Sequence, residues 1–302
     1  VKELFEAVWG PAVASVNADV SAMQTIVDSE NNTFKIKPWD YRFYAEKLRK
    51  EKHDIEMNDI TPYLQLDKLQ NGMFWAAGQL FGFTFKQIKN VPVFHEKVSV
   101  WEVSRHGKHV GLIYIDPFAR PGKLSGAWMT DLRKQEKFTS SKTPIVSINM
   151  NFNEGEPGQS TLLSFDDAET LFHEFGHALH GLASDVTYPS LSGIEVPQDY
   201  IEFPSRLMER WLMTPEIMKR FMLHHQSGEP IPTELIYKMK RASKFNQGFL
   251  TLEFLASAVV DLEIHMTPSR TAIDSSEFEK NKLAALNMPT EVTARHRLQI
   301  GR

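Results

Sequence analysis

The chain has 302 residues, of which 42% are hydrophobic and 24% are charged, a composition typical of a folded globular protein. Its net charge of −4 gives no reason to expect nucleic acid or an acidic membrane as a partner. No apolar run is long enough to span a bilayer, and the absence of cysteine excludes disulfides and thiolate metal ligands.

The chain begins with Val1 rather than methionine, inside a pattern that predicts a helix over residues 1–8. We therefore expect the natural N-terminus to lie further upstream, so the sequence carries no information on an export signal. The absence of cysteine fits a reducing compartment, which favours a cytoplasmic location without excluding export.

Four segments carry the periodicity of helices, with apolar residues that recur every three or four positions: residues 41–51, 63–81, 232–243 and 244–266. The last segment is apolar along much of its length, which predicts a buried helix, and we expect this helix to lie beneath the functional site. Its three acidic residues, Glu253, Asp261 and Glu263, argue against a membrane span.

A β region separates the helical segments. Residues 98–103 and 110–116 alternate between polar and apolar on either side of a turn at Gly107, which predicts a hairpin. Residues 144–150 predict a third strand. The sequence therefore predicts an α+β fold that is mainly helical with a small antiparallel β-sheet.

The pattern His173-Glu174-Phe175-Gly176-His177, here called the HEFGH motif, follows a stretch that reads as the start of a helix with Ser164 or Asp166 as its cap. On a helix, His173 and His177 share one face and can bind one zinc ion. Glu174 then lies beside the metal, where it can take a proton from water. Chance would produce about 0.05 such motifs in this composition, so two solvated histidines on an ordinary helix are the weaker alternative.

A catalytic zinc ion usually takes three protein ligands. Residues 202–211 predict a second helix with Glu202 in its first turn, where Pro204 is tolerated because first-turn amides have no helical acceptor. Glu202 can complete a His₂Glu site, although taken alone it is more simply a charge stabilised by the helix dipole. Glu209 lies on the same face and fits equally well as a partner for a ligating histidine or as a solvated residue.

Other residues are weaker candidates. Gly126 and Ala127 could expose backbone amides and carbonyls to an approaching chain, or they could belong to a surface loop. Tyr188 is more simply a packed loop residue than a substrate contact. His180 is expected at the helix surface or the edge of a cleft, because a fourth protein ligand would close the metal site.

Two segments carry a family resemblance: HEFGHALHGL from His173 and DYIEFPSRLMERW from Asp199. Together they resemble the thimet oligopeptidase (M3) family of zinc metallopeptidases, and within it the bacterial dipeptidyl carboxypeptidases. The likeness covers almost the whole chain, through residues 36–46, 74–82 and 118–129. It implies an HExxH zincin-type catalytic domain that acts on short peptides.

The resemblance also implies roles for individual residues. His173, His177 and Glu202 would hold one Zn²⁺ ion, and Glu174 would be the catalytic base. Gly126 and Ala127 would lie at the edge that pairs with an extended peptide, and Tyr188 would lie in a mobile loop that borders the cleft. Mn²⁺ or Co²⁺ could also occupy such a ligand set.

Family members continue past the segment matched by residues 294–298 into a Gly- and Tyr-rich stretch, whereas this sequence ends at Arg302. The resemblance therefore implies that residues 1–302 are part of one zinc peptidase catalytic domain, without an N-terminal helical portion and a final C-terminal portion. The expected activity is release of C-terminal dipeptides. An oligopeptide endopeptidase, or an inactive fragment that binds zinc or peptide, remains as an alternative, and the oligomeric state is open.

Overall fold

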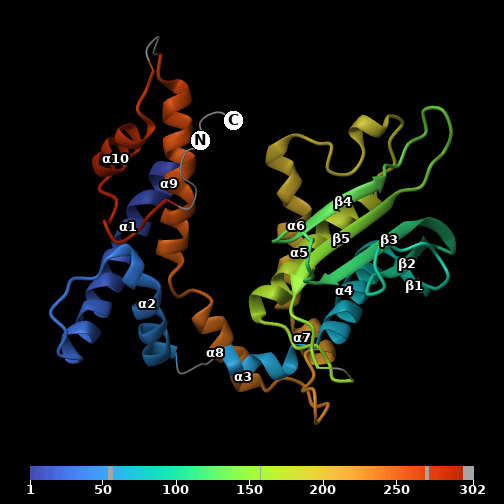
Figure 1. The fold of residues 1–302 in the computed structure, drawn as a ribbon, viewed down its shortest axis with the longest axis horizontal. Helices are drawn as coiled ribbons and strands as arrows, with labels where there is room; N and C mark the ends of the chain where they lie inside the picture. The colour runs from blue at the N-terminus through green and yellow to red at the C-terminus, as the bar shows by residue number, and fades with distance from the viewer. Residues whose placement is uncertain (54–56, 157, 269–271, 295–302) are drawn as a thin grey trace. The chain divides into compact units, whose positions relative to one another are not determined.

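A computed structural model of the chain describes residues 1–53, 57–156, 158–268 and 272–294 (Figure 1). The chain divides into two compact units. One is formed by Val1–Ile55 together with Glu234–Arg302, and the other by Glu56–Thr233. All the residues of the HEFGH motif lie in the second unit. That the two units act as one catalytic domain stays a prediction.

The first unit is helical in its described residues. Its core is built around Tyr41, whose ring stacks on Phe249 at 4.1 Å between centroids and whose hydroxyl donates a 2.9 Å hydrogen bond to Asn246. The helices of this unit are α1 (Lys2–Ser29), α2 (Pro38–His53), α8 (Thr233–Ala242, from its second residue), α9 (Gln247–Met266) and α10 (Ser275–Ala285).

Helix α9 is partly buried, as its apolar sequence predicts, and it packs against α1 and α10 within the first unit. That this helix lies beneath the functional site stays a prediction. At Gly248 the contact with α1 is so close that a β-carbon would lie 2.9 Å from the carbonyl oxygen of Ala12. An apolar sequence shows that a helix is buried, but it does not show which surface buries it.

The second unit combines helices with a five-stranded sheet. Its apolar core lies between the sheet and the helix that carries the HEFGH motif. The helical elements are α3 (Met57–Ile60), the 3₁₀ helix η1 (Thr61–Tyr63), α4 (Leu66–Phe81), α5 (Phe165–Leu182), the 3₁₀ helix η2 (Pro189–Leu191), α6 (Gln198–Leu212) and α7 (Pro215–Phe221). The strands are β1 (Phe83–Ile88), β2 (Ser99–Arg105), β3 (Lys108–Phe118), β4 (Trp128–Arg133) and β5 (Ile145–Phe152).

The strand order is β1-β2-β3-β5-β4, with β4 at one edge (Figure 1). The predicted hairpin is confirmed as the antiparallel pair β2–β3, and the α+β class is confirmed. The prediction of a purely antiparallel sheet is wrong at one pair, because β5 runs parallel to β3. The chain passes from β3 through the edge strand β4 before β5 inserts between them, and such a crossover leaves no local sequence signal.

Helix α5 packs its apolar face against β3, β4 and β5. Phe175 is fully buried on this face, with its ring 5.7 Å from the ring centroids of both Phe74 and Phe85. Residues two positions before and after a helical residue point roughly to the opposite side of the helix. Burial of Phe175 therefore turns His173 and His177 away from the sheet and toward α6.

Candidate metal centre

The start of α5 is fixed by a capping box. The Ser164 hydroxyl accepts a 3.1 Å hydrogen bond from the amide of Asp167, and the Asp167 carboxylate accepts one of 3.2 Å from the amide of Ser164. This reciprocal pair satisfies two amides that have no partner inside the helix. It confirms Ser164 as the cap and fixes the register in which the helix presents the HEFGH motif.

Helix α6 begins at Gln198, four residues before Glu202. The expectation that Glu202 and Pro204 lie in the first turn is therefore wrong, since they are the fifth and seventh residues of the helix. Instead, the backbone at Pro204 and Ser205 lies against Gly176 of α5, where a β-carbon would meet the Ser205 α-carbon at 2.5 Å. Because glycine lacks a β-carbon, the two helices can approach closely at this point.

The side chain of Glu202 is held by Ser205, one turn further along α6. The buried Ser205 hydroxyl lies 2.7 Å from Glu202 Oε2 and 3.0 Å from the Glu202 carbonyl oxygen, so one hydroxyl can bridge both acceptors. This contact directs the Glu202 carboxylate toward the histidines of α5.

Three ligand atoms from the two helices form a nearly equilateral triangle. Nε2 of His173 and Nε2 of His177 are 3.2 Å apart, and Oε2 of Glu202 lies 3.3 Å from the first and 3.4 Å from the second. A tetrahedral ion with bonds of about 2.0–2.1 Å separates its ligands by about 3.3–3.4 Å. The triangle therefore fits one small cation with a fourth position free, and the sequence predicts all three of these residues as ligands.

The other ring nitrogen of His173 contacts Glu209. Nδ1 of His173 and Oε1 of Glu209 are 2.6 Å apart, and Arg206 donates a 3.0 Å bond to the same carboxylate oxygen. A carboxylate on Nδ1 fixes the ring orientation and leaves Nε2 free to bind a metal. Burial lowers the pKa of His173, but the bond to Glu209 and the charges of Glu174, Glu202 and Glu209 outweigh it and leave the pKa raised.

His177 and His180 lie on the more buried part of α5. Burial lowers the pKa of both imidazoles, and the neutral form is the one that binds a metal. Nδ1 of each ring has no hydrogen-bond partner among the described residues. His180 is not part of the ligand triangle, and its ring packs 6.0 Å from that of Tyr200.

Glu174 is 5% exposed, and its Oε2 finds no hydrogen-bond partner within the part of the chain that the structure describes. The pKa of this carboxyl is raised to about 7, chiefly by burial, while His173 opposes the rise and the nearby charge of Glu202 adds to it. A carboxyl that titrates near neutral pH is suited both to accept and to return a proton.

Glu174 opens onto a cavity of about 540 Å³. Gly126 and Ala127 line it, directly before the strand β4. That they contact a substrate stays a prediction. The remaining lining residues are Asn151, Phe152, Asp166, Asp167, Glu169, Thr170, His173, Arg206 and Glu209.

Among these, the sequence offered no signal for Asn151 or Arg206 as site residues. Asn151 is one polar residue on a mostly buried strand, and Arg206 is one charge on an amphipathic helix. Both are recognised as site residues only from the fold, in which α5, α6 and β5 line one cavity.

Tyr188 lies apart from the lining of this cavity. It precedes the 3₁₀ helix η2, is 50% exposed, and packs its ring 5.2 Å from that of Phe138. A role for Tyr188 in substrate binding stays a prediction.

Residues 1–300 match the protein-family model described as "Peptidase family M3". The chain belongs to peptidase family M3. This confirms the resemblance drawn from the HEFGH and Glu202 segments.

The chain is similar to two kinds of peptidase. It is 40% identical over 274 residues to a dipeptidyl carboxypeptidase of Escherichia coli, a match that covers 89% of this chain and 40% of the relative. It is 32% identical over 253 residues to oligopeptidase A of Escherichia coli, covering 82% of this chain and 37% of the relative. The chain thus spans about 40% of the length of these curated relatives.

Every helix among the described residues is too short or too polar to cross a membrane.

Proposed function

We propose that this chain carries the zinc site of a peptidase that hydrolyses short peptides and releases C-terminal dipeptides. The observation that supports it most directly is the triangle of His173, His177 and Glu202 atoms, with edges of 3.2–3.4 Å that suit a tetrahedral ion. Zinc is proposed because two imidazoles and one carboxylate with an open position form a typical catalytic zinc ligand set. When bound, zinc would polarise the scissile carbonyl and make a nearby water more acidic.

Glu174 is the proposed catalytic base. Its buried carboxyl, with a pKa raised to about 7 by burial, lies next to the ligand triangle and opens onto the cavity. As the carboxylate it takes a proton from the attacking water, and as the acid it gives that proton to the leaving amine. Glu209 holds the ring of His173 in the orientation that this geometry needs.

The proposed place of the peptide is the wall formed by Gly126 and Ala127. These residues lead into β4, the edge strand of the sheet, and no described strand pairs with its outer side. An extended peptide can add to such an edge through main-chain hydrogen bonds, which recognise a backbone rather than one sequence.

Release of dipeptides is proposed rather than internal cleavage because the dipeptidyl carboxypeptidase of Escherichia coli is the more similar of the two relatives. Oligopeptidase activity is the second candidate, supported by the 32% identity to oligopeptidase A. A third candidate is a chain that binds zinc or peptide without cleaving it. A cytoplasmic location remains a prediction from composition.

The test compares a hexapeptide that has a free C-terminal carboxylate with the same peptide as its amide. Both are incubated with this chain and with the longest native protein that contains it, each loaded with zinc, and products are identified by mass spectrometry. Dipeptides released only from the free acid support the proposal, and internal cuts in both peptides support the oligopeptidase. Zinc binding without cleavage by either protein contradicts a peptidase, and cleavage that survives complete removal of metal contradicts the metal site.

A further inference from the structure

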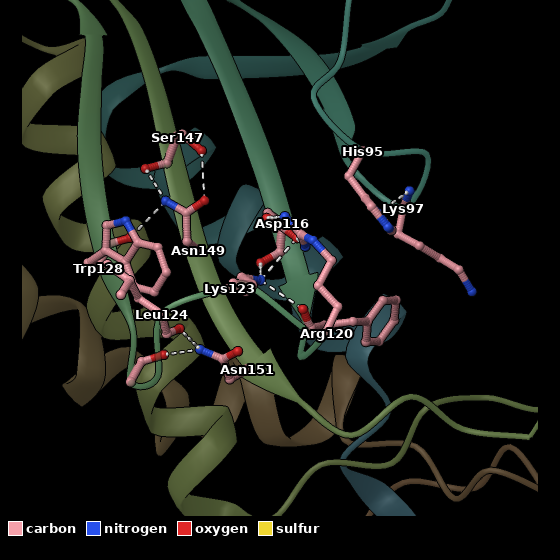
Figure 2. Close-up of polar contacts among 12 residues, drawn as sticks. His95, Lys97, Asp116, Arg120, Lys123, Leu124, Trp128, Ser147, Asn149 and Asn151 are labelled. Atoms are coloured by element: carbon pink, nitrogen blue, oxygen red, sulfur yellow. Dashed lines mark hydrogen bonds and ion pairs between the residues drawn. The ribbon is translucent and has the colours of Figure 1, made fainter.

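The segment between β3 and β4, residues 119–127, forms one wall of the cavity through Gly126 and Ala127. Most of this segment is exposed, so packing in the core does not fix its course, and Leu124 is 75% exposed. Two groups of polar side chains hold it instead, one at the end of β3 and one on β5 (Figure 2).

The first group is centred on Asp116, which is 1% exposed on β3. Arg120 donates two bonds to its carboxylate at 2.7 and 2.8 Å, and the buried ammonium of Lys123 lies 3.0 Å from the same carboxylate. Lys123 also donates to the carbonyl oxygens of Asp116 and Phe118 at 3.0 and 2.8 Å. These contacts tie the first half of the segment to the strand it leaves.

The second group consists of one residue, Asn151 on β5. Nδ2 of Asn151 donates to the carbonyl oxygens of Leu124 and Gly126, both at 2.7 Å. The bond between Asn151 and Leu124 is drawn in Figure 2. An amide group has two hydrogens, so these bonds use its whole donor capacity. Gly126 has a φ of +87°, a backbone conformation that side chains disfavour, and the bond from Asn151 holds its carbonyl in this orientation.

Asn151 also lines the cavity, together with Gly126, Ala127 and Glu174. Asn151 therefore both holds the wall in place and borders the cavity. The bond from Asn151 thus fixes the backbone at Gly126, directly before Ala127 and the outer edge of β4, where main-chain groups are open to a ligand.

We propose that Asn151 is a positioning residue for substrate binding: it sets the shape of the Gly126–Ala127 wall against which an extended peptide lies. This inference rests on the proposed function. It assigns Asn151 no contact with the metal ligands, so it predicts that changes at Asn151 alter peptide binding and leave metal binding as it is.

The test uses Asn151→Asp, which has nearly the same shape but presents a carboxylate to two carbonyl oxygens. The matched control is Asn153→Asp, the same change of charge at an exposed residue just beyond β5. Asn151→Ala is a second variant, which removes both bonds without adding repulsion. All are made in the Glu174→Gln background so that the peptide is not cleaved.

Each zinc-loaded protein is titrated by calorimetry with acetyl-tetra-alanine that has a free C-terminus, and separately with zinc after metal removal. Loss of two hydrogen bonds predicts about ten- to a hundredfold weaker peptide binding for Asn151→Ala, and a larger loss for Asn151→Asp. Zinc affinity should stay unchanged in both Asn151 variants. Asn153→Asp should bind peptide as tightly as its parent, the Glu174→Gln protein without a second substitution. Hydrogen exchange of amides 122–128 should rise in the Asn151 variants alone.

Peptide binding by Asn151→Asp and Asn151→Ala that equals the parent would overturn this inference and leave the proposed function standing. Equal losses of peptide and zinc affinity would also overturn it, because they would show general support of the fold rather than positioning. A parent chain that binds zinc but no peptide would instead contradict the proposed function on which the inference rests.

Discussion

Gly176 of α5 and Ser205 of α6 are in such close contact that a β-carbon on Gly176 would lie 2.5 Å from the Ser205 α-carbon. The proposed ligands His173 and His177 flank this glycine on one helix, and the proposed ligand Glu202 lies one turn before Ser205 on the other. The distance between the two helices at this crossing therefore determines whether the three ligand atoms can meet.

Gly176→Ala should separate the helices and weaken the metal site. Overpacking of this kind costs about 1–3 kcal/mol of stability, and more where backbone rather than a side chain must move. Zinc affinity, measured by competition with a chelator, should fall together with stability in urea. Gly72→Ala is the control, because its new β-carbon meets the side chain of Phe221 at 3.1 Å. It should leave zinc affinity unchanged, and a Gly176→Ala protein with normal zinc affinity would contradict the role of the crossing.

Glu174→Gln should keep zinc and lose hydrolysis. The amide has the same shape as the carboxyl but cannot take a proton, and general base catalysis contributes about 10²–10⁴-fold in rate. The measurement is peptide turnover in the longest active protein that contains this chain, with metal content determined on the same sample. Undiminished turnover would remove Glu174 from the role of base.

Glu202→Ala and Glu209→Gln should affect metal binding to different degrees. Loss of Glu202 removes a ligand, whereas Glu209→Gln weakens only the partner of His173 Nδ1, a change that costs about 10–100-fold in metal affinity at comparable sites. Zinc dissociation constants should therefore rise in the order parent, Glu209→Gln, Glu202→Ala. An unchanged constant for Glu202→Ala would exclude this residue from the ligands.

Asp116→Asn should destabilise the second unit, because it leaves the buried ammonium of Lys123 without its counter-charge. Breaking a buried ion pair costs about 3–5 kcal/mol. The control is Asp185→Asn, which removes an exposed pair with Lys137 and should cost about 0–1 kcal/mol. Denaturant unfolding at pH 7 compares the two, and equal losses would contradict a special role of Asp116.

The same pair predicts a pH dependence. Burial alone would raise the pKa of Asp116, but the bonds and positive charges of Arg120 and Lys123 outweigh it and hold the pKa below its usual value. A group with a depressed folded-state pKa stabilises the fold fully above its unfolded pKa of about 3.9 and loses this contribution as pH falls through the folded value. The advantage of the parent over Asp116→Asn should therefore persist at pH 7 and shrink below about pH 4.

The sequence predicts two of the three proposed metal ligands from a local signal. His173 and His177 are four residues apart, slightly more than one helical turn, and Ser164 marks where that helix starts. Spacing alone therefore places the two imidazoles on one face. Glu202 needs the family resemblance, because a single carboxylate on a second helix has no pattern of its own. The structure adds the contact at Gly176, which explains how the two helices bring the ligands together.

Most of what the sequence does not predict depends on long-range packing. The parallel pairing of β3 with β5 and the packing of α9 against α1 follow from which surfaces meet. Asn151 belongs to the same class, because its two acceptors are 25 and 27 residues away in the chain. The position of Pro204 inside α6 has a local reason, because the helix starts at Gln198 without a side-chain cap to mark it.

The ligand triangle and its orienting carboxylate come entirely from α5 and α6, whereas Asp116, Asn151 and the wall they hold come from an earlier stretch of the chain. The proposed function therefore assigns metal binding and peptide binding to two separate, consecutive parts of the sequence. Substitutions within residues 116–152 are expected to alter how strongly a peptide backbone is held and to leave the proposed metal ligands in place.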